Sequence, residues 1–212
     1  MTGWIADHII EIFGAVTGII YVFLEIKQNI WLWPVGIATS VTYIYVFRIN
    51  GFYADMLLQV YYLIISIYGW WAWKHGTLKA DEQNKDLKIM RLDVRTTVWT
   101  SAATLFIFAV MWYVLDNWTD SPVPLWDAVI TTLSVVATWM LTRKILEQWH
   151  VWIIANAIAI AVYIFKGMYP TVILFIVYFV MAVEGLREWR RDYYGNSYAR
   201  QLNDDKLTDQ IT

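Results

Sequence analysis

Two stretches that lie 116 residues apart decide the fold: WPVGIATSVTYIYVFRINGFY, residues 33–53, and WHVWIIANAIAIAVYIFKGMY, residues 149–169. They align without a gap, and the same offset continues into the segment that follows each of them. Six Trp, Gly and Tyr residues coincide in this one register: Trp33 with Trp149, Gly51 with Gly167, Tyr53 with Tyr169, Tyr62 with Tyr178, Gly69 with Gly185 and Trp73 with Trp189. Composition alone does not produce such agreement, so we interpret the chain as an internal duplication.

The composition indicates a membrane protein. Of the 212 residues, 59% are hydrophobic and 16% are charged, whereas a soluble domain is about half apolar and about a quarter charged. Helices that are apolar on every face suit a bilayer, whose core is crossed by about twenty apolar residues, better than a soluble bundle. We therefore predict an all-α integral membrane protein with seven transmembrane helices, over residues 9–26, 30–49, 52–73, 97–115, 125–142, 149–165 and 168–186.

The duplication divides these helices into three, one and three. We predict a first three-helix repeat in residues 1–74, a cytoplasmic loop and linker helix in 75–120, a second three-helix repeat in 121–190, and a polar cytoplasmic tail in 191–212. Four predicted crossings separate corresponding helices, so both repeats run in the same direction. Parallel repeats about an axis along the membrane normal are typical of one class of transporters, which includes the SWEET sugar transporters. A duplicated scaffold without a transport pathway is the alternative.

The basic residues predict the orientation. Arg48 and Lys166 fall on the side that carries the N-terminus, whereas the other fourteen of the sixteen Lys and Arg residues fall on the opposite side. The cytoplasmic loops of membrane proteins carry the excess of Lys and Arg. We expect the N-terminus outside the cell and the C-terminus in the cytoplasm.

Asn156 lies in a run of about seventeen residues, 149–165, that is otherwise almost wholly apolar. A buried amide left unsatisfied in hydrocarbon costs several kcal/mol. Trp149, Trp152, Asn156 and Tyr163 follow one another at spacings of 3, 4 and 7, so they share one face of a helix. Two indoles, an amide and a phenol on one face favour a binding site for a flat, polar ligand. The alternative is that Asn156 holds two helices together, through a bond worth about 0.6–2 kcal/mol in membranes.

The rest of the predicted site stands on the second and third helices of the first repeat and on the last predicted helix, where Tyr178 corresponds to Tyr62. A full amide stands on the third predicted helix and a hydroxyl stands at the counterpart of Asn156 on the second. We include in the predicted site Gln59, Tyr62, Tyr178, Ser40 and Tyr43. Each has a structural alternative, because amides in membranes also bond neighbouring helices and tyrosines also pack bundles.

Charged residues near the helix ends are interpreted as structural. Asp55 opens a predicted helix and suits a cap, and Glu184 stands three residues before Arg187, at a spacing typical of an interfacial ion pair. A proton relay requires a chain of ionisable groups across the membrane, and the sequence shows none. We therefore predict transport without a coupling ion.

Other functional classes find no support in the sequence. The chain has no cysteine, and its three His residues lack a second ligand at metal-binding spacing, so we predict no metal, no cofactor and no enzyme activity. A net charge of −2 and the lack of a basic patch argue against nucleic acid as a partner. The internal duplication argues against a seven-helix receptor.

Four segments together resemble the PnuC family of bacterial vitamin transporters. They are WLWPVGI (31–37), GFYADMLLQVYYLIISIYGWWAW (51–73), LWDAVITTLSVVATWMLTRKILEQW (125–149) and WHVWIIANAIAIAVYIFKGMY (149–169), and the resemblance covers about residues 10–190. It implies a SWEET-like fold in the bacterial inner membrane, and a homotrimer as a further expectation. It also implies import of nicotinamide riboside by facilitated diffusion, with the substrate trapped by a cytoplasmic kinase.

The resemblance gives the predicted residues specific roles. Asn156 would bind the carboxamide of the substrate, while Trp149 or Trp152 would stack on its ring, since a pyridinium cation favours aromatic faces. The family often has Asn where this chain has Ser40. A related branch of the family carries thiamine, which is also flat, singly cationic and hydroxylated, so the sequence leaves nicotinamide riboside and thiamine as alternatives.

Overall fold

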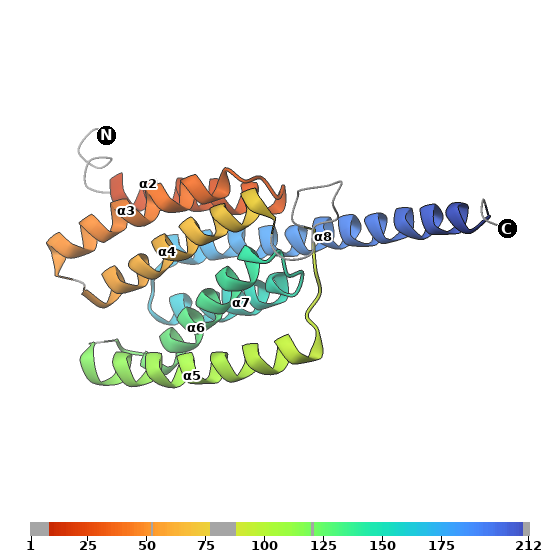
Figure 1. Cartoon of the computed structure of the whole chain (residues 1–212). Helices are drawn as coiled ribbons and strands as arrows, with labels where there is room; N and C mark the ends of the chain where they lie inside the picture. Colours follow the sequence, from red (N-terminus) through yellow and green to blue (C-terminus); the bar gives the residue numbers. More distant parts are fainter. Residues whose placement is uncertain (1–8, 52, 77–87, 120, 210–212) are drawn as a thin grey trace.

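Seven helices make up most of the computed structural model, which describes residues 9–51, 53–76, 88–119 and 121–209 (Figure 1). The prediction of an all-α protein with seven helices is confirmed over these residues, and the predicted segments agree with the helices to within a few residues at most ends. The exception is the last helix, which continues past residue 190 without a break. The helices are α2 (Ile9–Ile26), α3 (Leu32–Asn50), α4 (Tyr53–His75), α5 (Val94–Trp118), α6 (Pro124–Thr142), α7 (Gln148–Phe165) and α8 (Tyr169–Asp209).

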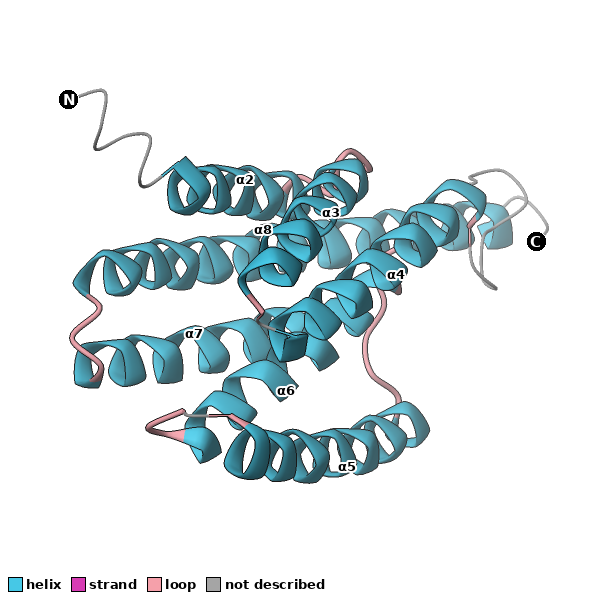
Figure 2. Cartoon of the chain, turned by 90° about the vertical axis from the view of Figure 1, so that its left-hand side faces the viewer, coloured by secondary structure: helices cyan, strands magenta, loops and turns pink. Residues whose placement is uncertain are grey.

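Six of the helices form a closed ring. In the order α2, α3, α4, α6, α7 and α8, each helix packs against the next, and α8 packs back against α2. Among the described helices, α5 contacts α6 alone, and it lies at the edge of the molecule in both views (Figure 1, Figure 2). The two halves of the ring therefore meet at two joints, α2 with α8 and α4 with α6.

The helix surfaces suit a bilayer. Five helices (α3, α5, α6, α7 and α8) are long and apolar enough to cross a membrane, by length and composition, and α2 offers a shorter apolar stretch, Ile12–Ile26. Helix α5 buries none of its residues and exposes large apolar side chains such as Trp99, Leu105 and Phe106. Such a surface fits hydrocarbon better than water. Membrane crossing by α2 and α4 as well stays a prediction.

A pair of buried tryptophans in each half of the ring packs against a glycine. In the second half, the rings of Trp149 and Trp189 meet edge to face with 5.6 Å between their centroids. A Cβ atom at Gly185 would overlap the ring of Trp149, so the indole reaches this position because the residue is glycine. The residues 116 positions earlier repeat the arrangement. The ring centroids of Trp33 and Trp73 lie 5.4 Å apart, and a Cβ atom at Gly69 would overlap the ring of Trp33.

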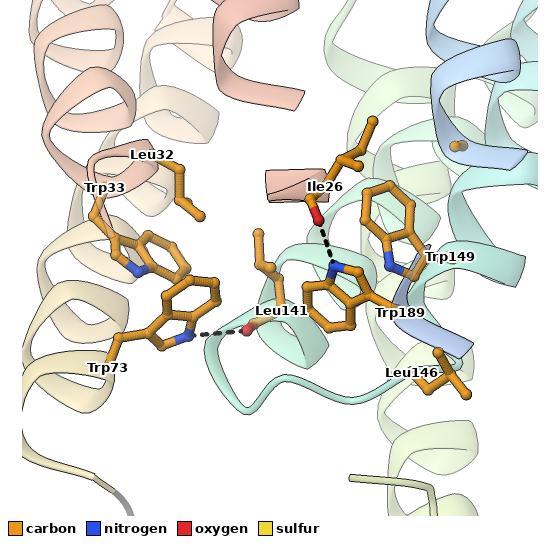
Figure 3. Packing of buried hydrophobic residues seen from close by; sticks show 9 residues of the cluster. Ile26, Leu32, Trp33, Trp73, Leu141, Leu146, Trp149 and Trp189 are labelled. Carbon is orange, nitrogen blue, oxygen red and sulfur yellow. Dashed lines mark hydrogen bonds between the residues drawn. The ribbon is translucent and has the colours of Figure 1, made fainter. Parts of the chain in front are cut away.

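Trp73, near the end of α4, and Trp189, in the middle of α8, also tie the two halves together. Nε1 of Trp73 donates to the carbonyl of Leu141 at 3.3 Å, across the joint between α4 and α6. Nε1 of Trp189 donates to the carbonyls of Glu25 and Ile26, each at 3.2 Å, across the joint between α2 and α8 (Figure 3). Glu25 and Leu141 are themselves 116 residues apart, so the two bonds occupy corresponding places.

The backbone follows the same offset at two connections. Gln28 and Lys144 both adopt left-handed φ angles, 52° and 49°, which are uncommon for residues other than glycine. Gly51 follows α3 with a φ angle of 78°, and Gly167 follows α7 with a φ angle of 71°. These recurrences are what a duplicated three-helix unit requires. The parallel arrangement of three, one and three helices itself stays a prediction.

We expect Gly185→Ala to destabilise the fold. Because the new methyl group would overlap the buried ring of Trp149, the free energy of unfolding should fall by about 1–3 kcal/mol, as for other overpacked cores. Thermal melting of the purified protein in detergent, followed by tryptophan fluorescence, measures this change. Gly195→Ala is the matched control, because nothing lies within 4 Å of a Cβ atom there. Equal melting temperatures for the two variants would contradict the packing argument.

Candidate functional site

A cavity of about 430 Å³ lies inside the six-helix ring. All six ring helices contribute residues to its wall, and none of the described lining residues belongs to α5. Its volume lies within the usual range for small-molecule sites, roughly 300–1,000 Å³. The ring therefore encloses a space of the right size for a vitamin-sized molecule.

Seven of the nine residues predicted from the sequence line this cavity. They come from four different helices, so the fold brings together positions that the duplication had only related to one another. The seven residues are Ser40, Gln59, Tyr62, Trp149, Trp152, Asn156 and Tyr178. Their roles toward a ligand remain predictions.

The other two predicted residues, Tyr43 and Tyr163, are not among the described residues that line the cavity, so their place in the site stays a prediction. The Tyr43 hydroxyl donates to the carbonyl of Ile10 at 3.2 Å, at the beginning of α2. Tyr163 stacks on Phe175 with 5.1 Å between the ring centroids, and it is Phe175 that lines the cavity. Tyr163 stands seven residues after Asn156, roughly 10 Å along a helix.

The amide of Asn156 faces the cavity without a protein partner. The residue is buried, with 4% of its surface exposed, yet its side chain forms no hydrogen bond with any described residue. Gln59 is partly buried and lines the cavity from α4, and no described residue bonds its side-chain amide. Since an amide that holds two helices together would bond the second helix, this arrangement favours a role in ligand binding.

The two indoles on α7 add faces and donors to the wall. Nε1 of Trp149 and Nε1 of Trp152 are buried, and neither finds a hydrogen-bond acceptor among the described residues. Trp149 is held in place by its edge contact with Trp189. Fixed aromatic rings of this kind suit a flat ligand, because they lose little conformational freedom when it binds.

Glycines on α2 and α3 allow tyrosines to approach the cavity closely. A Cβ atom at Gly18 would overlap the hydroxyl of Tyr178, and one at Gly36 would come within 3.0 Å of the ring of Tyr21. Both glycines line the cavity themselves. The phenol groups therefore occupy space that larger residues on α2 and α3 would fill.

Sequence reasoning missed the contribution of α2. Thr17, Tyr21 and Glu25 line the cavity and are spaced four residues apart, so they form one polar stripe on a mostly apolar helix. Glu25 is almost completely buried, at 1% exposed. Its position two residues before Lys27 makes it look like one of the charged residues at a helix end. The regular spacing of the stripe was the signal that could have revealed it.

Basic groups lie around the cavity but not in it. No Lys, Arg or His is among the described residues that line the wall. Lys27 pairs with Glu188 at 3.2 Å, and Lys166 pairs with Asp127 at 2.8 Å at the opposite end of the ring. The predicted pair of Glu184 and Arg187 is confirmed on the surface, at 3.4 Å.

Comparisons with known proteins place the chain among vitamin transporters. The sequence profile of the family described as "Nicotinamide mononucleotide transporter" matches residues 8–191. "Nicotinamide riboside transporter PnuC" of Escherichia coli (strain K12) is 26% identical, over 85% of this chain and 84% of the relative. "Riboflavin/roseoflavin transporter RibM" of Streptomyces davaonensis is 23% identical, over 88% of this chain and 89% of the relative. A solved structure, "Crystal structure of the Vitamin B3 transporter PnuC", is 25% identical with a TM-score of 0.69, over 89% of this chain and 83% of the other.

We expect Asn156→Leu to leave the stability of the protein unchanged or slightly raised. The amide bonds no described residue, and leucine suits a helix inside a membrane protein. Tyr61→Phe is the matched control, because the Tyr61 hydroxyl donates across helices to the carbonyl of Val135 at 2.8 Å. Its loss should lower the free energy of unfolding by about 1 kcal/mol. Thermal melting compares the variants, and a clear loss of stability in Asn156→Leu would show that the amide holds helices together.

Proposed function

Because this chain belongs to the PnuC family of vitamin transporters, we propose that it imports nicotinamide riboside. The observation that carries the proposal is the Asn156 amide, which faces the cavity without a protein partner beside the indoles of Trp149 and Trp152. A nicotinamide group is a flat ring that bears an amide. An asparagine can donate to such an amide and accept from it at once, while an indole stacks on the ring. The tyrosine, serine and threonine hydroxyls of the wall suit the ribose.

The charge of the cavity favours a nucleoside over a nucleotide. The family takes its description from nicotinamide mononucleotide, which carries a phosphate group. Proteins hold phosphate mostly with Arg, Lys and clusters of backbone amides. The described wall contains no basic side chain and its residues lie within helices, whose backbone amides are already bonded. The riboside, which lacks the phosphate, therefore fits better.

Other vitamins remain weaker candidates. RibM is described as a riboflavin and roseoflavin transporter, so members of the family differ in substrate. Thiamine, which the sequence left open, finds no support in the relatives named above. We retain nicotinamide riboside because two of those comparisons carry its name or that of vitamin B3.

The transport mechanism that we propose is facilitated diffusion through a bacterial inner membrane. Glu25 is a buried carboxyl group in the wall, but a relay for protons requires a chain of such groups, and Glu25 is the single carboxyl among the described lining residues. Uptake would become one-way when a cytoplasmic kinase phosphorylates the riboside, because the cavity does not suit a phosphate. A homotrimer is also part of the proposal, since α5 has an apolar surface that buries nothing within one chain.

Uptake into proteoliposomes tests the proposal. Labelled nicotinamide riboside should equilibrate across the membrane without accumulating, whether or not a proton or sodium gradient is imposed. Asn156→Leu should need roughly 5- to 150-fold more substrate for half-maximal uptake, because the substrate amide would lose a buried partner at a cost of about 1–3 kcal/mol. Trp152→Ala should weaken uptake to a similar degree, and Trp152→Phe less. An unchanged substrate requirement in Asn156→Leu would contradict the proposed site.

The proposed orientation, with the N-terminus outside, is tested by cysteine labelling. The chain contains no cysteine, so single variants report one position each. Asp116 lies at the end of α5 on the side with few basic residues, and Arg190 lies on α8 on the basic side; both are exposed. An impermeant maleimide added to intact cells should label Asp116→Cys and not Arg190→Cys. The reverse pattern would invert the topology.

A further inference from the structure

We propose that Glu25 is the counter-charge for a cationic ring in this cavity, and that it makes the transporter prefer charged over uncharged nicotinamide nucleosides. This inference rests on the proposed function and adds a residue that determines specificity. It concerns a side chain in the last turn of α2, at the wall of the cavity.

The carboxyl group of Glu25 is buried but incompletely bonded. Its residue is 1% exposed, and the indole of Trp189 donates to its backbone carbonyl at 3.2 Å. The side-chain amide of Gln148 faces the carboxyl group. The Oε1 atom of Glu25 is buried and has no hydrogen-bond partner among the described residues. A buried oxygen of this kind, at the wall of a cavity, is available to a ligand.

The surrounding basic residues are engaged elsewhere. Lys27 pairs with Glu188 at 3.2 Å, on the outside of the ring. Nζ of Lys144 lies 4.5 Å from the centre of the Trp73 ring and 3.4 Å from Oε1 of Gln28. No described basic side chain lines the cavity. Among the residues that the structure describes, the wall thus contains one carboxyl group and no cation to pair with it.

The second half of the ring supplies no matching charge. Leu141 stands at the position that corresponds to Glu25 and is fully buried. The cavity therefore offers one possible negative charge, which complements one positive charge on a ligand.

A pyridinium ring needs such a partner. Its charge is permanent, so it cannot become neutral by losing a proton when it leaves water, and an unpaired charge is costly to bury. The indoles compensate part of this cost through cation–π contacts. A carboxylate beside the ring would compensate the remainder, and it would give no advantage to a ligand without the charge.

Nicotinamide riboside and its reduced dihydro form test the inference. The two compounds share the amide and the ribose, but the ring of the reduced form is uncharged. We expect the purified full-length protein to bind the cationic form roughly 30-fold or more tightly than the reduced form in calorimetry, a factor typical of a buried charge pair. Glu25→Gln should lose affinity for the cation by a similar factor and keep its affinity for the reduced form.

Two further variants complete the experiment. Glu184→Gln removes a carboxylate of α8 that lies on the surface with Arg187, and it should keep the wild-type preference. Glu25→Asp retains the charge and should retain most of the preference. The wild-type comparison requires no variant, so it decides on the preference for the cation even if Glu25→Gln does not fold.

The outcomes separate the inference from the function on which it rests. Equal affinity of the wild type for both compounds would overturn the role of Glu25 and leave the proposed substrate in place. Retention of the preference in Glu25→Gln would also overturn the role of Glu25, because the carboxylate would then be dispensable. An equal loss of affinity for both compounds would overturn it as well, because the carboxylate would then be structural. Failure of the wild type to bind either compound would overturn the proposed function itself.

Discussion

The indole of Trp189 donates to the carbonyls of Glu25 and Ile26, and the indole of Trp73 donates to that of Leu141. Carbonyl groups in the last turn of a helix find no N–H donor in the regular pattern of that helix. Inside a membrane protein, other protein groups must supply the donor. The two tryptophans supply donors at both joints of the ring. The carbonyls of Glu25 and Leu141 also accept from the backbone N–H groups of Gln28 and Lys144, so each indole adds a second donor. These bonds join the two halves at the two places where the ring closes around the cavity.

Closure of the ring changes what polar residues can do. On a single helix, a polar side chain must turn toward a neighbouring helix or toward the lipid head groups. Inside a ring of six helices, Asn156 and Gln59 face a shared space and need no partner from the protein. Each unpartnered group adds a cost when it is buried. Under the proposed function, this cost would make the site discriminate between ligands, since a ligand that satisfies these groups removes it and one that leaves them without a partner does not.

Part of the site could be predicted from the sequence because its residues break a pattern. Asn156 and Gln59 stand out as amides in apolar helices, and the duplication links Tyr62 to Tyr178. Tyr43 and Tyr163 were assigned by helical face alone, and neither is among the described residues that line the cavity: Tyr43 bonds a backbone carbonyl and Tyr163 stacks on Phe175. Glu25 was missed for the opposite reason. Its place near the end of a helix resembles that of an ordinary interfacial charge, and only the packing of α3 and α8 around α2 buries it.

The sequence by itself determined the helices, their approximate ends and the correspondence between Trp33, Gly69 and Trp73 and the residues 116 positions later. These features are local, because they follow from apolar length, turn residues and repetition along the chain. The tertiary structure decided which helices are neighbours, how deep the cavity reaches and which polar atoms are left without partners. Those properties depend on the distances between segments far apart in the chain. Helical periodicity predicts the direction in which a side chain points but not what it meets there.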